Sequence, residues 1–521
     1  MLYIYIIPMR SSQRVHFRQK TMAKSYFPLI IISIILLLNP PPSIFSARII
    51  NHQKGLVDFT PKSRESPAKK LIRELNLFPQ HDANIVPNNH QSVLVDSETG
   101  ITEKCLELDI LGDPQPTPND LGHHAGYFSL PQTVGARMFY FFFESRGNNN
   151  TDPVVIWLTG GPGCGSELAL FYENGPFHIT KDLSLVWNNF GWDTVSNIIY
   201  VDQPTGTGFS YSSSDDDLRH DEKGVSNDLY NFLQAFFKLH PEYAKNDFYI
   251  TGESYAGHYI PALAGRINQG NQKKEGITIN LKGFAIGNGL TNPAIQYEYL
   301  TQFALDNKLI SQSDYKGFNS SVAELEQAIQ ACDSDGGDNC DNAFYLGNDL
   351  FQSILDIAGD INYYDIRKKC VGSLCYDFSN LETFLNEDTV KEALGVGNID
   401  YVSCSSTVYD QMIDDWMQNL EVGIPALLEE GVKVLIYAGE YDLICNWLGN
   451  SKWVNAMVWS GQKDFVAAPT VQFSVNGTAA GQQKSHGPLT FLKVLNAGHL
   501  VPMDQPQASL VMLQKWMQGT L

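Results

Sequence analysis

The feature that most constrains this chain of 521 residues is a serine set among small residues at 252–257, Gly-Glu-Ser-Tyr-Ala-Gly. The apolar stretch 248–250 precedes it, and a second apolar run, 259–263, follows it. This pattern predicts a strand, a sharp turn and a helix, with the turn lifting the Ser254 hydroxyl out of a sheet. Small residues allow the strand and the helix to pass closely. Ser254 is therefore a candidate nucleophile, although position 256 is Ala where the usual pattern has Gly.

Two later segments supply the partners of a nucleophilic serine, which are a base that takes its proton and an acid that orients the base. A β-branched run at 432–437 predicts a strand, and Asp442 lies in the loop that follows. A second strand candidate at 491–495 is followed by His499. The chain order Ser254, Asp442, His499, with each residue after a strand, is the order of the α/β-hydrolase triad.

A glycine-rich segment supplies donors for the oxyanion that forms when a serine attacks a carbonyl group. The apolar run 154–158 predicts a buried strand, and Thr159, Gly160 and Gly161 follow it directly. Because glycine lets backbone N–H groups approach a ligand, we expect the N–H groups of Gly161 and Tyr255 to form an oxyanion hole.

Strands and helices alternate along the chain, which predicts an α/β fold with a mostly parallel sheet. The helix expected at 224–240 has apolar residues at helical spacing, so one of its faces should pack on that sheet. Between about 291 and 390 the sequence becomes helical and rich in Asp and Asn. We therefore expect a helical insertion at 291–390 between two parts of the core, 98–290 and 391–521. The other expected strands are 138–144, 198–202 and 281–286.

The N-terminal residues read as a targeting segment. Residues 27–38 are apolar and follow five Lys and Arg side chains, which predicts a secretory signal within 1–47, cleaved near Ser46 or Ala47. A signal anchor is the alternative, but the apolar core is short for a membrane span. The polar segment 48–97 is then either a cleaved pro-segment or a disordered extension.

The charge balance excludes one class of partner. Residues 1–46 hold five Lys and Arg, which leaves 31 of the 36 basic side chains against all 57 Asp and Glu. Nucleic-acid binding needs a basic surface, so it is not expected. An acidic compartment would suit such a chain, because protonation reduces the repulsion.

The predicted secretion bears on the roles of the cysteines and of three asparagines. Eight cysteines can form disulfides there, and Asn149, Asn319 and Asn476 begin glycosylation sequons. No cysteine pair or histidine cluster has the spacing of a metal site, so no metal or other cofactor is expected.

With these motifs in order, the chain resembles the serine carboxypeptidases, most closely the plant type III members, from about residue 126 to the C-terminus. The resemblance implies release of single residues from peptide or protein C-termini through an acyl-enzyme, with an acidic optimum, in a vacuole or outside the cell. A monomer and a homodimer both remain open. The matching segments are residues 160–164, 202–204, 252–261, 286–289, 445–447 and 498–499.

The resemblance also implies a site for the terminal carboxylate of the substrate. Glu173 and Glu253 would lie together there, and like charges at close range raise the pKa of at least one of them. A protonated carboxyl can donate a hydrogen bond to the substrate, whereas two ionised ones would repel it. The adjacent contacts fall on Trp157, Thr159 and Gly160. Position 159 is usually Asn in the family, so a hydroxyl here replaces an amide donor.

The family further implies pockets and disulfides. The pocket of the leaving residue would contain Tyr172, Tyr364, Tyr376 and Leu500, and the acyl side would contain Tyr255 and the free thiol of Cys445. Such walls favour bulky apolar side chains. Gly165 stands where the family usually has Ser, and its extra backbone freedom puts the positioning of the oxyanion loop in doubt. The expected disulfides are Cys164–Cys404, Cys370–Cys375 and Cys332–Cys340.

Three other functions share parts of this pattern. An acyltransferase that works from sugar esters uses the same triad and acyl-enzyme. A catalytically weak binding or protective protein would usually have lost a triad residue, and this chain has not. A secreted lipase or esterase would leave the two glutamates without a purpose.

Overall fold

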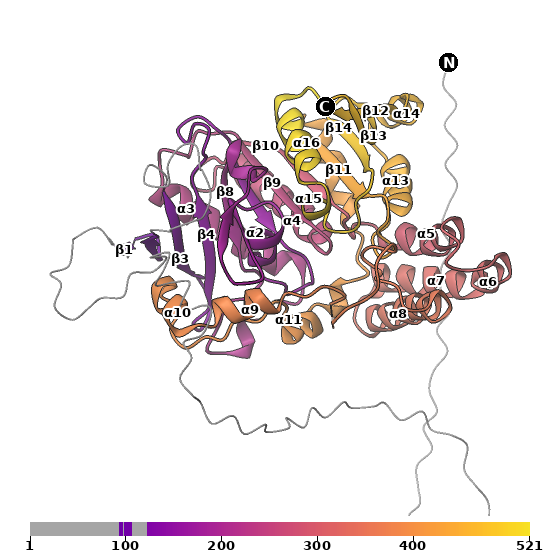
Figure 1. The fold of residues 1–521 in the computed structure, drawn as a ribbon, viewed down its shortest axis with the longest axis horizontal. Coiled ribbons are helices and arrows are strands. Elements are labelled where there is room, and N and C mark those ends of the chain that lie inside the picture. The colour runs from indigo at the N-terminus through magenta and orange to yellow at the C-terminus, as the bar shows by residue number, and fades with distance from the viewer. Residues whose placement is uncertain (1–92, 97, 107–121, 373) are drawn as a thin grey trace, which may run out of the picture. The chain divides into compact units, whose positions relative to one another are not determined.

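The computed structural model describes residues 93–96, 98–106, 122–372 and 374–521. The predicted signal segment and most of the predicted pro-segment lie outside these residues. The boundaries proposed for the segments of the chain stay predictions. Within the described part, strands alternate with helices along the chain. Most of the strands form one large sheet, and helices pack against it (Figure 1).

The described residues form a 12-stranded sheet in the order β1-β2-β3-β4-β8-β5-β9-β10-β11-β14-β13-β12. The strands from β8 to β14 in this order run parallel, and antiparallel strands extend both edges. A two-stranded sheet consists of Phe177–Ile179 (β6) and Leu185–Trp187 (β7). The strands of the large sheet are Val93–Asp96 (β1), Ile101–Cys105 (β2), His123–Ser129 (β3), Arg137–Phe143 (β4), Val154–Leu158 (β5), Asn197–Val201 (β8), Phe248–Glu253 (β9), Leu281–Gly287 (β10), Lys433–Gly439 (β11), Val471–Val475 (β12), Thr478–His486 (β13) and Leu489–Val494 (β14).

The central strands are buried on both faces. Along β5, Val154 and Ile156 belong to one hydrophobic cluster and Val155 and Trp157 to another, since successive side chains point to opposite faces. Strands of this kind are continuous apolar runs without alternation, which is why the sequence marks them clearly.

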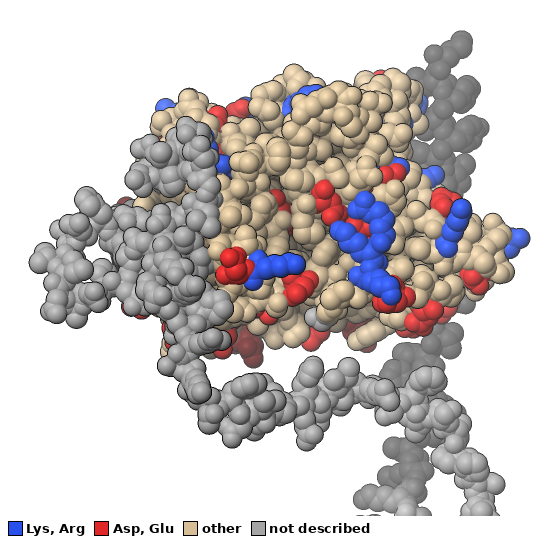
Figure 2. Space-filling view, in the orientation of Figure 1, with Lys and Arg blue, Asp and Glu red and all other residues tan. Residues whose placement is uncertain are grey.

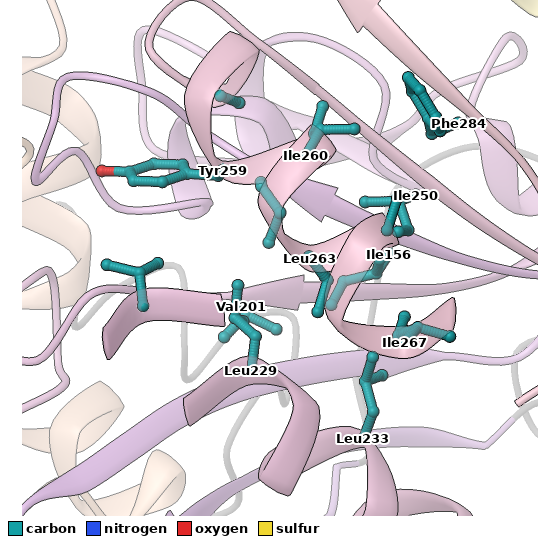
Figure 3. Packing of buried hydrophobic residues seen from close by; sticks show 14 of the residues in the cluster. Ile156, Val201, Leu229, Leu233, Ile250, Tyr259, Ile260, Leu263, Ile267 and Phe284 are labelled. Atoms are coloured by element: carbon teal, nitrogen blue, oxygen red, sulfur yellow. The ribbon is translucent and has the colours of Figure 1, made fainter. Parts of the chain in front are cut away.

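Helices α3, Glu222–Leu239, and α4, Ala256–Lys273, cover one face of the sheet. Figure 3 shows Leu229 and Leu233 of α3 and Leu263 and Ile267 of α4 beside strand side chains such as Ile156. Each such side chain contributes roughly 1.5–3 kcal/mol when fully buried. This packing holds α4 in place, and its first residue, Ala256, lies two residues after Ser254.

The other face is covered by helices that are distant in sequence. Leu170, Leu381, Val390 and Trp516, one from each helix, pack in the second cluster. The helices are α2 (Glu167–Tyr172), α9 (Ser379–Leu385), α10 (Asp388–Leu394) and α16 (Pro506–Gln518).

Between β10 and β11 the chain leaves the sheet and forms a group of helices with its own core (Figure 1). Leu300, Leu325 and Leu350 come from three of these helices and are buried together. The group consists of α5 (Pro293–Asp306), α6 (Gln312–Gly317), α7 (Asn319–Asp335) and α8 (Asp338–Ala358). The remaining helices are α11 (Ser406–Gln411), α12 (Ile424–Glu429), α13 (Trp447–Ala456), α14 (Gln462–Ala467) and α15 (Val501–Asp504).

The predicted α/β fold is confirmed, and the expected strands and helix agree with the structure within about two residues. The helix predicted at 224–240 starts earlier, at Glu222, because the Asp221 carboxylate accepts a hydrogen bond from the Gly224 N–H at 2.7 Å and caps its first turn.

Charge is mixed on the surface. On the face in Figure 2, Lys and Arg stand in small groups beside Asp and Glu, and no continuous basic surface is visible there. None of the helices that the structure describes has both the length and the apolar character needed to cross a bilayer.

Candidate active site

Ser254 lies on a sharp turn between β9 and α4 and has a positive φ of 64°. The turn depends on glycines at its two ends. A Cβ atom at Gly252 would lie 2.1 Å from the Leu158 carbonyl oxygen, and one at Gly257 would lie 2.3 Å from that of Leu290. The serine is thus held at the carboxyl edge of the parallel strands, as the sequence pattern predicts.

Asp442 and His499 follow two neighbouring parallel strands, β11 and β14. The His499 Nδ1 atom lies 2.8 Å from Asp442 Oδ2, and both side chains are buried. The same carboxylate oxygen accepts a hydrogen bond from the Asn288 amide at 2.8 Å. Within the described residues, His499 Nε2 is buried without a hydrogen-bond partner, and His499 and Ser254 line one cavity. The nitrogen that would take the serine proton is therefore unoccupied.

The glycine loop after β5 lies against the serine turn. A Cβ atom at Gly160 would be 2.4 Å from the Tyr255 backbone nitrogen and 2.7 Å from Ser254 Cβ. Gly161 follows with a φ of 113°, which favours glycine, and it lines the cavity together with Ser254. The loop therefore brings backbone groups close to the serine, where an oxyanion hole is expected.

Glu173 and Glu253 form a buried carboxyl pair beside Ser254. Glu173 follows α2 and Glu253 ends β9, and both buried side chains line one cavity with Ser254. Burial raises the pKa of Glu173, and the charge of Asp504 adds to this. Burial, followed by the charge of Glu173, raises the pKa of Glu253 well above its usual range. The pair therefore keeps a proton at pH values where exposed glutamates are ionised.

Thr159 completes this side of the cavity with Gly160. Its hydroxyl oxygen accepts a hydrogen bond from the Trp157 indole N–H at 3.0 Å. Trp157 itself is fully buried and does not line the cavity, so it acts behind Thr159. The threonine hydroxyl keeps its own proton for another acceptor.

The cavity that contains the carboxyl pair has a volume of about 70 Å³. Tyr364, Tyr376 and Leu500 line it as the resemblance implies, but Tyr172 does not. Tyr172 instead packs on Phe378, with ring centroids 5.2 Å apart. Five residues that line this cavity are not predicted for it, namely Leu168, Leu374, Phe378 and the disulfide-bonded Cys164 and Cys404.

Ser254 also lines a larger cavity of about 480 Å³. Tyr255 and Cys445 line it, as expected for the acyl side. Aromatic side chains supply much of the rest, and none of the described residues that line it is Asp, Glu, Lys, Arg or His. Burial raises the pKa of the Cys445 thiol well above its usual range, so this group stays neutral. The additional aromatic residues are Tyr297, Phe351, Tyr363, Tyr364, Tyr409 and Trp416.

Three disulfides join the cysteine pairs that were expected: Cys164–Cys404, Cys332–Cys340 and Cys370–Cys375. The first spans 240 residues and ties the glycine loop to the chain after the inserted helices. The third closes the short loop that carries Leu374. Cys445 forms no disulfide in the described part of the chain.

Gly165 lies beside a second buried carboxyl pair, Glu167 and Asp202. Its N–H donates to the Ser403 carbonyl at 3.0 Å, and it is not among the described glycines with positive φ. A Cβ atom here would meet Glu167 Oε2 at 2.7 Å and the Tyr401 hydroxyl at 3.0 Å. The backbone at this position is thus held by its neighbours, although glycine stands there.

Two other features of the sequence, the glycosylation sequons and the side chains of types that bind metals, add little to the site. Asn319 and Asn476 are exposed, while the Asn149 amide donates to Glu144 Oε2 at 3.1 Å. In residues 93–96, 98–106, 122–372 and 374–521, no group of three or more His, Cys, Asp and Glu side chains could hold a metal ion.

The parallel sheet, the serine turn and the order of acid and base define an enzyme fold of the α/β-hydrolase class. Comparison with known proteins is more specific. The family model described as serine carboxypeptidase matches residues 114–519. The chain belongs to this serine carboxypeptidase family.

Individual relatives agree. The chain is 62% identical over 461 residues to serine carboxypeptidase-like 48 of Arabidopsis thaliana, a match that covers 87% of this chain and 89% of the relative. It is 63% identical over 454 residues to serine carboxypeptidase 3 of Oryza sativa subsp. japonica, with the same coverage of 87% and 89%. A crystal structure of a prohormone-processing carboxypeptidase from Saccharomyces cerevisiae matches with a TM-score of 0.70 and 27% identity, over 78% of this chain and 93% of the yeast chain.

Proposed function

We propose that this protein is a serine carboxypeptidase that releases C-terminal amino acids from peptides and proteins through an acyl-enzyme at acidic pH. The observation that carries the proposal is the buried pair Glu173 and Glu253, which shares one cavity with Ser254 and His499. A hydrolase without a free terminal carboxylate in its substrate would have no use for two carboxyl groups at this position.

The proposed reaction gives each residue of the triad the role that is usual for its type. His499 Nε2 takes the Ser254 proton while Oγ attacks the last peptide carbonyl, and Asp442 stabilises the imidazolium that forms. The N–H groups of Gly161 and Tyr255 stabilise the oxyanion. His499 then protonates the leaving nitrogen as the C–N bond breaks. Water attacks the remaining ester by the reverse sequence and releases the shortened peptide.

The carboxyl pair recognises the end of the substrate. While the pair holds a proton, that proton is donated to the terminal carboxylate, with Thr159 and Gly160 as further donors. When both glutamates are ionised, they repel the substrate. The raised pKa of the pair therefore makes binding favourable at acidic pH and unfavourable as the pH rises.

The two cavities supply the side-chain preference. The leaving residue fits the small cavity beside Tyr364, Tyr376 and Leu500, and the residue before it fits the large cavity beside Tyr255 and Cys445. Both are lined mainly by apolar and aromatic side chains, so bulky apolar residues are the preferred substrates.

Maturation in the secretory pathway, followed by residence in a vacuole or outside the cell, is part of the same proposal. It is supported by the disulfides, which persist in oxidising compartments, and by the sequons and the apolar N-terminal segment. No nucleic acid is expected as a partner.

A comparison of three substrates tests the proposal. Purified mature protein is incubated at pH 5 with a blocked dipeptide, with its C-terminal amide and with a glucose ester, and the products are identified. We expect release of the free amino acid from the blocked dipeptide as the dominant reaction. Acyl transfer from the glucose ester, with no peptide hydrolysis, would contradict the proposal in favour of an acyltransferase.

A further inference from the structure

The return segment after the inserted helices, 362–368, runs between the loops that carry the catalytic acid and base. The Ile366 N–H donates to the Tyr441 carbonyl, one residue before Asp442, at 3.0 Å. The His499 N–H donates to the Tyr364 carbonyl at 2.7 Å. One short segment therefore holds the backbone of both catalytic loops.

Asp365 is the buried charge at the centre of this segment. Its side chain is fully buried, and Oδ2 lies 2.7 Å from Arg367 Nη2 and 3.0 Å from Lys368 Nζ. Burial alone would raise the pKa of Asp365, but the hydrogen bonds from Arg367 and Lys368 outweigh it and lower the pKa. The carboxylate is thus ionised and held by two cations.

Lys368 connects this charge to the base loop. Its Nζ atom also lies 3.0 Å from Asp504 Oδ1, and Asp504 Oδ2 accepts the Gly498 N–H at 2.7 Å. Gly498 directly precedes His499 and packs against the segment, because a Cβ atom there would lie 2.5 Å from the Tyr364 carbonyl oxygen. A continuous set of ionic contacts therefore reaches the residue before the catalytic base.

Arg367 touches both catalytic loops. Its guanidinium lies 4.4 Å over the Tyr441 ring, in the acid loop. Its Nη1 atom donates to the Asn496 carbonyl at 3.2 Å, in the base loop. A flat, delocalised cation suits this double contact, since it can stack and donate at the same time.

We propose that Asp365, Arg367, Lys368 and Asp504 form an ionic clasp that holds the acid and base loops at the separation needed for the Asp442–His499 hydrogen bond. The clasp rests on the proposed function, and its four residues are positioning residues that do not touch substrate. Because a shift of about 1 Å in a catalytic group can cost roughly 100-fold in rate, such a clasp would act on turnover more than on substrate binding.

The test compares charge-neutralised variants at constant pH. Asp365→Asn should lower kcat by about 10- to 100-fold and leave KM within about twofold. The rate at which an organophosphate labels Ser254 should fall by a similar factor, since it depends on the same base. Arg367→Gln, at a side chain that is 35% exposed, should fold even if Asp365→Asn does not, and should show the same split. Arg367→Lys should lie between this variant and the wild type.

Matched controls come from the neighbouring surface pair. Lys369 and Asp360 lie 3.2 Å apart and are 80% and 67% exposed. Lys369→Met and Asp360→Asn remove charges from the same loop and should leave kcat unchanged. Folded clasp variants with wild-type kcat and labelling rate, even with a lower Tm, would overturn the clasp alone. A wild-type protein that hydrolyses no peptide and takes no label would instead overturn the proposed function.

Discussion

The two cavities beside Ser254 differ in the kind of recognition that they offer. The small one, of about 70 Å³, contains the carboxyl pair and His499, so under the proposed function its binding depends on a proton. The large one, of about 480 Å³, is lined by no charged side chain in the described residues, so its binding depends on apolar contact. Under the proposed function, the leaving side recognises a terminal charge and the acyl side recognises a bulky side chain.

The two cavities are also lined by different parts of the chain. The small cavity takes Glu253 from a core strand and Thr159 from the loop after another. The large cavity takes much of its wall from the inserted helices, for example Tyr297 of α5 and Phe351 of α8. Under the proposed function, the carboxyl pair that recognises the terminal carboxylate belongs to the hydrolase core, while the side-chain preference depends on the insertion.

The largest effect is expected at Ser254, which is among the residues that line both cavities. Ser254→Ala should lower peptide hydrolysis by at least about 10,000-fold and abolish organophosphate labelling, with Tm unchanged. The matched control is Ser353→Ala on the exposed side of α8, which should retain full activity. Wild-type turnover in Ser254→Ala would refute the assignment of the nucleophile.

The second prediction separates the two cavities by substrate. A blocked dipeptide with Glu before the scissile bond should have a kcat/KM at least about tenfold below that of the matching Phe substrate at pH 6. The large cavity offers no partner for a buried charge, and an unpaired charge is costly to desolvate. Equal kcat/KM values for the two substrates would show that the acyl residue does not enter this cavity.

The third prediction concerns the thiol of the large cavity. A mercurial that modifies Cys445 should inhibit hydrolysis severalfold or more, because it fills the acyl side next to Ser254. Cys445→Ser should be resistant and should lose only about two- to fivefold in kcat/KM for a bulky acyl residue. If the Ser variant were inhibited like the wild type, the modified group would lie elsewhere.

The smallest effect is expected at Gly165, behind the small cavity. Gly165→Ser should change kcat/KM by no more than about twofold, because the atom that its Cβ would approach most closely is a side-chain oxygen of Glu167 and not a backbone atom. Gly165→Val, which adds bulk without a hydroxyl, serves as the comparison and should reduce activity further. A loss of tenfold or more in Gly165→Ser would mean that the oxyanion loop uses the freedom of glycine.

The positions of the three residues of the proposed catalytic centre could be predicted from the sequence because each follows a local pattern. Each of Ser254, Asp442 and His499 follows a strand that its apolar residues mark, and the carboxyl ends of parallel strands meet at one edge of the sheet. The strands themselves were recognisable because they are buried on both faces.

The cavity walls and the supports of the triad were harder to predict. Leu374 and Phe378 lie on a segment that returns over the active site after the inserted helices, and no local pattern fixes where such a segment packs. Tyr172 was assigned to the leaving side but packs behind it on Phe378. Asn288, which holds Asp442, was visible only as part of a Gly-Asn-Gly turn.

If a proton held by Glu173 and Glu253 binds the terminal carboxylate, KM for a substrate with a free C-terminus must depend on pH. Because the pKa of the pair is raised, the proton should be held at acidic pH and lost as the pH rises. KM for a blocked dipeptide should then rise by up to about tenfold per pH unit above the pKa of the pair, while KM for its C-terminal amide should change little. In the double variant Glu173→Gln, Glu253→Gln, the permanent amide donors should flatten the rise. The same increase of KM with pH for dipeptide and amide, or an unchanged profile in the double variant, would contradict the account.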